Sequence, residues 1–236
     1  TGTAPGRGCR LHCADMTINR SNKAISTRFH GYNFRSRLEA RWAVVFETLG
    51  LDWQYEPEGF QAPTGERWLP DFRLNFQGTQ TWVEIKPPRK VEISAGSWEF
   101  TFPAAEMNLL SRMAAGMPRE DKIWGIASNI PDPVELKKTP YIYDGSTLII
   151  DCGQDEWCDY DHWLCVCPSC REVGLEYNGR SARIKCGCLS NRKEAAGFHH
   201  PSHDHKNYTA DHPDLLAAYA AARGKRFEFG DREVWK

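Results

Sequence analysis

The sequence has no apolar run long enough to cross a membrane and no segment with the pattern of a secretory signal peptide. A membrane-spanning helix requires about 20 mostly apolar residues in succession, so no membrane partner is expected. The nine cysteines are an odd number and cannot all pair with one another, and disulfide-stabilised domains are typical of secreted proteins. The sequence therefore favours a protein of a reducing cytoplasm.

A large net charge is also lacking, because 30 basic and 31 acidic side chains leave a formal net charge of −1. The sum hides an uneven distribution: residues 1–50 carry +5, residues 51–160 carry −8 and residues 161–236 carry +2. An acidic middle between basic ends suits a protein whose ends bind nucleic-acid phosphates while metal ions offset the central carboxylates. Ordinary surface charge is the simpler alternative.

The remaining composition is that of a globular protein. The chain has 236 residues, 41% of them hydrophobic, including nine Trp and eleven Phe. This length accommodates one domain with a sizeable core and a small additional unit. Residues 1–29 are poorly patterned and contain several basic side chains, and we expect them to form a mobile arm.

Two neighbouring segments combine strand patterns with charged side chains. Residues 67–76 and 81–87 both have the composition of strands, and a short connection containing glycine lies between them. Pairing of these strands would bring Asp71 beside Glu84. Because side chains alternate between the two faces of a strand, Glu84 and Lys86 share one face. We expect Asp71 and Lys86 at the strand surface, where replacing either with alanine would leave the fold intact.

The chemistry of these side chains favours a metal site. Two carboxylates held close together attract a hard divalent cation, and Mg²⁺ or Mn²⁺ suits an oxygen site that retains several waters. Asp71 and Glu84 are the expected ligands, with the main-chain carbonyl of Ile85 as a further donor. The Lys86 ammonium can stabilise charge that develops on a phosphate or help to position a water. A turn followed by a solvated strand face is the simpler interpretation of the same residues.

A helix is predicted ahead of these strands. Ser36 is a candidate N-cap, Glu39 stands at the third helical position of a capping box, and the run ends at Gly50. The apolar residues recur at helical spacing, namely Leu38, Trp42, Val45 and Leu49. Glu39 flanks this apolar stripe and can therefore reach the predicted metal site. Alternatively, its carboxylate only caps its own helix.

The order of these elements resembles a known family. A strand over residues 51–57 follows the helix, and Pro70-Asp71 is separated by twelve residues from Glu84-Ile85-Lys86. This arrangement resembles the PD-(D/E)XK nuclease superfamily. The residues of four segments are similar to those of phage-encoded nucleases of this type and of the endonuclease subunit of heteromeric transposases. These segments are Phe34 to Ala40, Tyr55-Glu56-Pro57, Pro70-Asp71-Phe72 and Val83 to Pro87.

The resemblance implies an α/β fold over residues 30–155, with a restriction-endonuclease-like mixed sheet core flanked by helices. It also implies a metal-dependent endonuclease that hydrolyses DNA phosphodiester bonds, with catalytic residues Glu39, Asp71, Glu84 and Lys86. Such an enzyme would act in the cytoplasm of a bacterial host cell if a phage encodes it. The alternative is a non-catalytic module that binds DNA or a protein with a nuclease fold and a zinc ribbon as its reader. Both the enzyme and the binding module allow a protein partner or a homodimer.

The α/β alternation continues after the second strand. Residues 103–115 have a helical pattern, with proline suited to the first turn, and residues 121–128 have the pattern of a buried strand. Residues 140–152 are rich in strand formers around Asp144-Gly145, which predicts a hairpin at the end of the domain.

A cysteine cluster predicts a small zinc-ribbon appendage over residues 160–192. Cys-x-x-Cys followed by Cys-x-Cys can place four thiolates around Zn²⁺, and the expected ligands are Cys167, Cys170, Cys186 and Cys188. Cys165 is a possible substitute for one of them. Residues 172–185 are predicted to form the hairpin between the two pairs. A site closed by four thiolates would be structural.

The C-terminal region, residues 193–236, is predicted to contain a polar loop and a helix. The loop carries the histidines of the segment His199 to His205, for which a surface loop is the preferred interpretation over a metal site. The helix is expected over residues 214–227. Four further cysteines are left without a role: Cys9, Cys13, Cys152 and Cys158.

Overall fold

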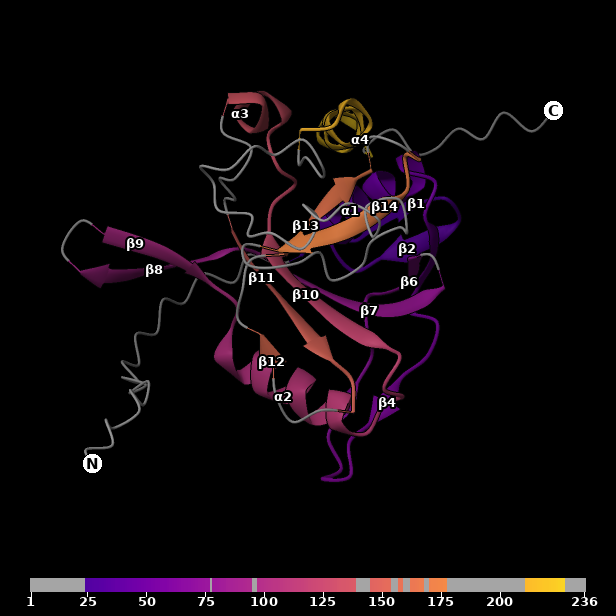
Figure 1. Ribbon diagram of the computed structural model, residues 1–236, viewed down its shortest axis with the longest axis vertical. Coiled ribbons are helices and arrows are strands. Elements are labelled where there is room, and N and C mark those ends of the chain that lie inside the picture. Colours follow the sequence, from indigo (N-terminus) through magenta and orange to yellow (C-terminus); the bar gives the residue numbers. More distant parts are fainter. Residues whose placement is uncertain are drawn as a thin grey trace, which may run out of the picture.

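The computed structural model describes residues 24–76, 78–94, 97–138, 145–153, 157–158, 162–167, 170–177 and 211–227. Its centre is a six-stranded mixed sheet flanked by helices (Figure 1). In spatial order its strands are β12 (Trp157–Cys158), β11 (Gly145–Asp151), β10 (Lys122–Ser128), β7 (Thr79–Lys86), β6 (Phe72–Phe76) and β3 (Asp52–Tyr55). β7 and β10 are parallel, and the other neighbours are antiparallel. The expectation of a mixed α/β sheet flanked by helices is confirmed.

The other strands form two-stranded pairs around this sheet. These pairs are β1 (Thr27–Phe29) with β2 (Tyr32–Phe34), β4 (Phe60–Gln61) with β5 (Arg67–Trp68), β8 (Arg89–Ser94) with β9 (Ser97–Thr101), and β13 (His162–Val166) with β14 (Val173–Tyr177). The helices are α1 (Arg37–Thr48), α2 (Ala104–Ala115), α3 (Pro133–Lys138) and α4 (Pro213–Gly224).

Each face of the sheet packs against its own hydrophobic core. Val83 and Ile85 belong to a cluster that includes residues of α1, α4 and the β13–β14 pair. Trp82, on the opposite face of the same strand, belongs to a second cluster with residues of α2. This division follows from the alternation of side chains along β7. It places Glu84 and Lys86 on the α2 side, and Val83 and Ile85 on the other, as the sequence predicts.

Helix α1 forms for the reasons that its sequence indicates. Ser36 is the N-cap, and its hydroxyl accepts a hydrogen bond of 3.1 Å from the Glu39 amide. Trp42, Val45 and Phe46 are buried in the core, as expected of an apolar stripe at helical spacing.

Several other predicted elements are confirmed with small shifts at their ends. The strands predicted over 51–57, 81–87 and 121–128 are β3, β7 and β10, and the helices predicted over 103–115 and 214–227 are α2 and α4. For the hairpin predicted over 140–152, β11 forms but residues 139–144 lie outside the described residues.

The strand predicted over residues 67–76 is wrong in one respect, because the chain forms two strands there. β5 pairs with β4, and β6 joins the central sheet. The break falls at residues 69–71, where Pro70 has no amide hydrogen to donate to a ladder. At this point a side chain, not a main-chain carbonyl, accepts the amide of β7: Oδ2 of Asp71 accepts a hydrogen bond of 2.6 Å from the Ile85 amide.

The mobile arm predicted over residues 1–29 is wrong at its C-terminal end. Residues 27–29 form β1, which pairs with β2, and Phe29 is buried in the core. Burial of an aromatic ring fixes this segment to the rest of the fold. Residues 1–23 lie outside the described residues.

The hairpin predicted over residues 172–185 is only partly described: β14 forms within it, and residues 178–185 lie outside the described residues. β14 pairs with β13, which precedes it, and the Cys167 amide donates to the Glu172 carbonyl at 2.9 Å to close the turn. Leu164 and Leu175, one from each strand, are buried in the same cluster as α1 and α4. Apolar pairing across the strands therefore ties this hairpin to the main core.

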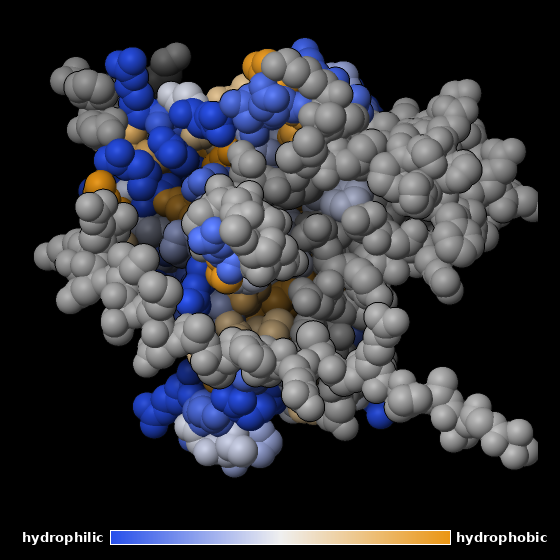
Figure 2. Space-filling view, turned by 90° about the vertical axis from the view of Figure 1, so that its left-hand side faces the viewer, coloured by the Kyte–Doolittle hydropathy of each residue, from blue (hydrophilic) through white to orange (hydrophobic). Residues whose placement is uncertain are grey.

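Two surface properties complete the description. None of the helices in the described ranges is long and apolar enough to span a bilayer. On the face shown in Figure 2, the coloured residues are mainly hydrophilic, with hydrophobic residues in separated places. The large apolar side chains that are exposed among the described residues lie apart in the sequence: Ile25, Tyr32, Leu69 and Val134.

Candidate functional site

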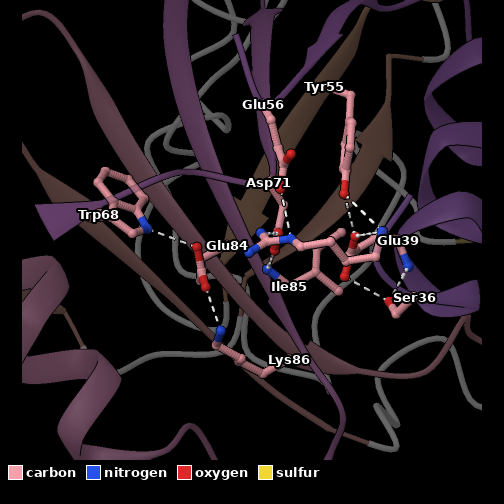
Figure 3. A network of polar contacts seen from close by, with 10 residues as sticks. Ser36, Glu39, Tyr55, Glu56, Trp68, Asp71, Glu84, Ile85 and Lys86 are labelled. Atoms are coloured by element: carbon pink, nitrogen blue, oxygen red, sulfur yellow. Dashed lines mark hydrogen bonds and ion pairs between the residues drawn. The ribbon is translucent and has the colours of Figure 1, made fainter. Parts of the chain in front are cut away.

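The candidate site lies where β6 and β7 stop pairing. Phe72 and Val83 are the last partners at that end of the ladder. Asp71 immediately precedes Phe72, and Glu84 immediately follows Val83, so the two acidic residues adjoin across the strands. Both are buried, with 2% and 6% of their surfaces exposed. The predicted juxtaposition of these carboxylates is therefore present (Figure 3).

Asp71 uses both of its carboxylate oxygens. Oδ2 accepts the bond from the Ile85 amide, and Oδ1 accepts a bond of 2.6 Å from Nη2 of Arg35. The main-chain carbonyl of Asp71 also accepts from the Glu56 amide at 3.0 Å. These contacts come from three separate segments, and together they fix the carboxylate in one orientation.

Glu84 is held by two donors on the same side of the sheet. Nζ of Lys86 lies 2.5 Å from Oε1, and Nε1 of Trp68 donates to Oε2 at 2.7 Å. The Lys86 side chain is 30% exposed, so its ammonium bridges the buried carboxylate and the solvent. Glu84 and Lys86 thus share one face and contact each other, as predicted.

Glu39 caps its own helix and also accepts hydrogen bonds from residues outside it. Its Oε1 accepts from the Ser36 hydroxyl at 2.7 Å, which belongs to the helix start. Its Oε2 accepts from the Tyr55 hydroxyl at 2.8 Å and from the Arg35 amide at 3.1 Å. The Arg35 amide also donates to the Tyr55 hydroxyl oxygen at 3.0 Å. Burial, partly offset by this bond, raises the pKa of Tyr55, so its hydroxyl stays protonated and remains a donor.

The acidic side chains of the site affect one another electrostatically. Burial is the first cause that raises the pKa of Asp71 from 3.8 to about 8, followed by the charges of Glu84 and Glu39. The Ile85 amide and Arg35 act in the opposite direction. The charges of Glu84 and Glu39 therefore disfavour ionisation of Asp71. A cation among these side chains would offset their repulsion, so the acidic cluster favours cations.

The two cations of the site respond to this cluster. Burial alone would lower the pKa of Lys86, but the neighbouring Glu84 carboxylate raises it above its ordinary value. In the same way Asp71 overcomes the effect of burial on Arg35 and raises its pKa. Both side chains therefore stay charged at neutral pH.

One expectation about the site is wrong. Asp71 was expected at the strand surface, where alanine would leave the fold intact, but the side chain is almost fully buried. Alanine at this position would remove the acceptor of the Ile85 amide, and an unsatisfied buried donor costs about 1–3 kcal/mol. The carboxylate is held in this buried position by the Ile85 amide and by Arg35.

Sequence reasoning missed Arg35, Tyr55, Glu56 and Trp68 as parts of this site. All of them lie in or next to the segments that carry the family resemblance, which is the signal that could have found them. Their contacts, however, join residues that are 16 to 36 positions apart. No local pattern predicts such pairs.

The predicted zinc ligands are only partly described. Cys167 is buried and Cys170 is exposed, while Cys186, Cys188 and the segment His199 to His205 lie outside the described residues. Cys165, the possible substitute, is also buried. Within the described ranges no three His, Cys, Asp or Glu side chains are arranged to hold a metal.

The cysteines without a predicted role differ in their positions. Cys9 and Cys13 lie outside the described residues, and Cys158 belongs to β12. Cys152 is buried in the second core, and burial followed by the charge of Asp121 raises its pKa to about 12. Its thiol is therefore protonated and unreactive at neutral pH.

Comparison of the chain with models of known protein families, with curated proteins and with solved structures gives no significant match.

The bond from Trp68 to Glu84 leads to a first prediction. Trp68→Phe keeps an aromatic ring in the core but removes the donor to Oε2, so Glu84 should lose its fixed orientation. Glu84 is one of the expected metal ligands, so we expect the affinity for Mn²⁺ to fall by about 10- to 100-fold, the usual effect of losing a residue that orients a metal ligand. Isothermal titration calorimetry with Mn²⁺ measures this change.

Trp82→Phe is the matched control. Trp82 is another buried indole, and its Nε1 donates to the Asp121 carboxylate at 3.0 Å. Both variants lose a bond to a carboxylate, so their losses of unfolding free energy should be similar, about 1.5–3 kcal/mol. Equal Mn²⁺ affinities of the two variants would show that Trp68 does not position Glu84.

Proposed function

We propose that this protein is a metal-dependent endonuclease that hydrolyses DNA phosphodiester bonds, built on a restriction-endonuclease-like core. The observation that supports the proposal best is the convergence of Asp71, Glu84 and Lys86 at the point where β6 and β7 separate, with Glu39 close enough to raise the pKa of Asp71. Buried carboxylates beside a lysine are the groups that hydrolysis of a phosphodiester requires.

The donor set fits a hard divalent cation. Asp71 and Glu84 each already hold a cationic side chain at 2.5–2.6 Å, so their oxygens are oriented toward positive charge. These two carboxylates, with the Ile85 carbonyl, would hold Mg²⁺ or Mn²⁺. When bound, such an ion would polarise the scissile phosphate and lower the pKa of a water.

The remaining side chains act on the substrate and the water. Lys86 presents its ammonium from the buried carboxylate toward solvent, where it would stabilise negative charge on the phosphate oxygens. Glu39 is held by Tyr55 and Ser36, and its carboxylate would orient the attacking water or support a second ion. The cationic Arg35 at the mouth of the site, 54% exposed, adds a group that attracts a phosphate backbone.

A cleavage assay tests the proposal. We expect the purified protein to cut at least one of plasmid, linear, branched or single-stranded DNA with Mg²⁺ or Mn²⁺ and to be inactive with a chelator. Lys86→Ala should lower the rate by about 100-fold, as loss of one group that stabilises the transition state does. Gel electrophoresis of the products measures the rate.

Lys122→Ala is the control for this variant. Lys122 is also a partly buried lysine of the central sheet, and it pairs with Asp151 at 2.8 Å. The Lys122→Ala variant should cleave DNA at the wild-type rate. Tight, metal-dependent DNA binding without any cleavage would instead support the alternative of a non-catalytic binding module.

A further inference from the structure

Arg35 joins two acidic residues at the edge of the site. Its Nη2 lies 2.6 Å from Oδ1 of Asp71, and its Nε lies 2.6 Å from Oε1 of Glu56. The side chain is half exposed, whereas Asp71 is almost fully buried. The guanidinium therefore lies between the buried carboxylate and the solvent, on the path that another cation would take to Asp71.

Glu56 is fixed beside Asp71 by the backbone. Its amide donates to the Asp71 carbonyl, and its φ of 44° lies in the left-handed region, which a side chain other than glycine adopts only when its surroundings enforce it. Among the described residues, no hydrogen bond of good geometry reaches the buried Oε1 of Glu56, and its contact with Arg35 is ionic. Glu56 thus anchors the arginine without locking its direction.

The two carboxylate oxygens of Asp71 have different partners, and this difference determines what Arg35 does when a metal ion binds. Oδ2 is bonded to the buried Ile85 amide, and Oδ1 is the oxygen that the half-exposed Arg35 side chain holds. If a divalent ion bound to Oδ1 while the guanidinium stayed bonded to the same oxygen, the two cations would lie within a few ångströms of each other and would repel each other. The two cations compete for one oxygen.

We propose that Arg35 is a tethered positioning cation that leaves Asp71 when a divalent ion binds and stays at the site through Glu56. Its contact with Asp71 holds the buried carboxyl group in its orientation, and metal binding exchanges one cation for the other. The released guanidinium then faces solvent at the entrance of the site. This inference rests on the proposed function, because the metal ion belongs to the proposed nuclease site.

Chemical modification of arginine tests the exchange. Phenylglyoxal reacts with free guanidinium groups, and mass spectrometry of the digested protein gives the rate at each arginine. With saturating Mn²⁺ we expect the rate at Arg35 to rise about tenfold, which corresponds to the loss of about 1.4 kcal/mol of ion-pair stabilisation. Mn²⁺ binding is measured in the same samples from the loss of the free-ion signal in electron paramagnetic resonance.

Two comparisons sharpen the result. Arg223 is 45% exposed and pairs with Asp132 at 3.0 Å, and its rate should not respond to Mn²⁺. In Asp71→Asn the rate of modification at Arg35 should be high with and without Mn²⁺.

Mn²⁺ binding to the wild type with no change in the modification rate at Arg35 would overturn the exchange alone. No Mn²⁺ binding would overturn both the exchange and the metal-dependent function. Release of Arg35 in a protein that cuts no DNA would support the exchange and count against the nuclease proposal.

Discussion

Replacing Asp71 with asparagine is expected to lower the rate of DNA cleavage by at least about 1,000-fold, which corresponds to about 4 kcal/mol of lost transition-state stabilisation. Asparagine has the same shape, and its carbonyl oxygen can still accept the bond from the Ile85 amide. It lacks the negative charge with which Asp71 would hold a divalent ion. Single-turnover cleavage of a labelled duplex with excess enzyme measures the rate without a contribution from product release.

Asp121→Asn is the matched control for this variant. Asp121 is a buried aspartate whose Oδ2 accepts from Trp82 and Gln80, each at 3.0 Å. The variant should cleave DNA within a few-fold of the wild type. If Asp71→Asn retained the wild-type rate, Asp71 would not be a metal ligand and the proposed site would be wrong.

The raised pKa of Asp71 predicts how the stability of the metal-free protein depends on pH. The carboxyl has a pKa of about 8 in the folded protein against an ordinary value of 3.8, so the folded state binds more protons between these values. The free energy of unfolding should therefore fall as the pH rises from about 4 to about 8, with no further loss above that range.

Asp71→Asn isolates this contribution because asparagine does not titrate. We expect the variant to gain stability relative to the wild type between pH 5 and pH 8, by an amount on the order of a few kcal/mol, since each unit of pKa shift is worth about 1.36 kcal/mol. Urea unfolding with a chelator present measures both proteins. If the free energies of unfolding of the two proteins changed in parallel with pH, Asp71 would be ionised over the whole range.

The sequence was a good guide wherever a regular pattern governs the structure. The spacing of Trp42 and Val45 predicted α1 and its buried face, and strand alternation predicted that Glu84 and Lys86 share one face. The adjacency of Asp71 and Glu84 also followed from pairing two neighbouring strands. These features depend on contacts between residues that are close in the chain.

The features that the sequence did not predict depend on the tertiary structure. Arg35 reaches Asp71 across 36 positions, so its role has no local pattern. The buried position of Asp71 likewise depends on its contacts with the Ile85 amide and with Arg35. The pairing of β14 with β13 also has no signal in the cysteine spacing, because β13 precedes both cysteine pairs.

The cysteine hairpin carries the last prediction, which concerns a second metal. We expect the protein to contain one Zn²⁺ held by Cys167, Cys170, Cys186 and Cys188. The first two lie in the turn that joins β13 to β14, where the Arg171 amide donates to the Cys167 carbonyl at 2.8 Å. Because β13 and β14 also contribute to the core around α1 and α4, loss of the zinc should weaken the main fold as well as the turn.

Cys167→Ser is therefore expected to lose zinc and to unfold at a markedly lower temperature, since a structural zinc contributes about 10–16 kcal/mol in small zinc domains. Atomic absorption gives the zinc content, and calorimetry gives the melting temperature.

Cys152→Ser is the control, because this buried cysteine lies in the other core and its loss should affect packing but not the zinc content. Full zinc content in Cys167→Ser together with loss of zinc in Cys165→Ser would transfer the ligand role to Cys165. Full zinc content after replacement of all four proposed ligands would exclude the ribbon, and β13 and β14 would then depend on apolar packing alone.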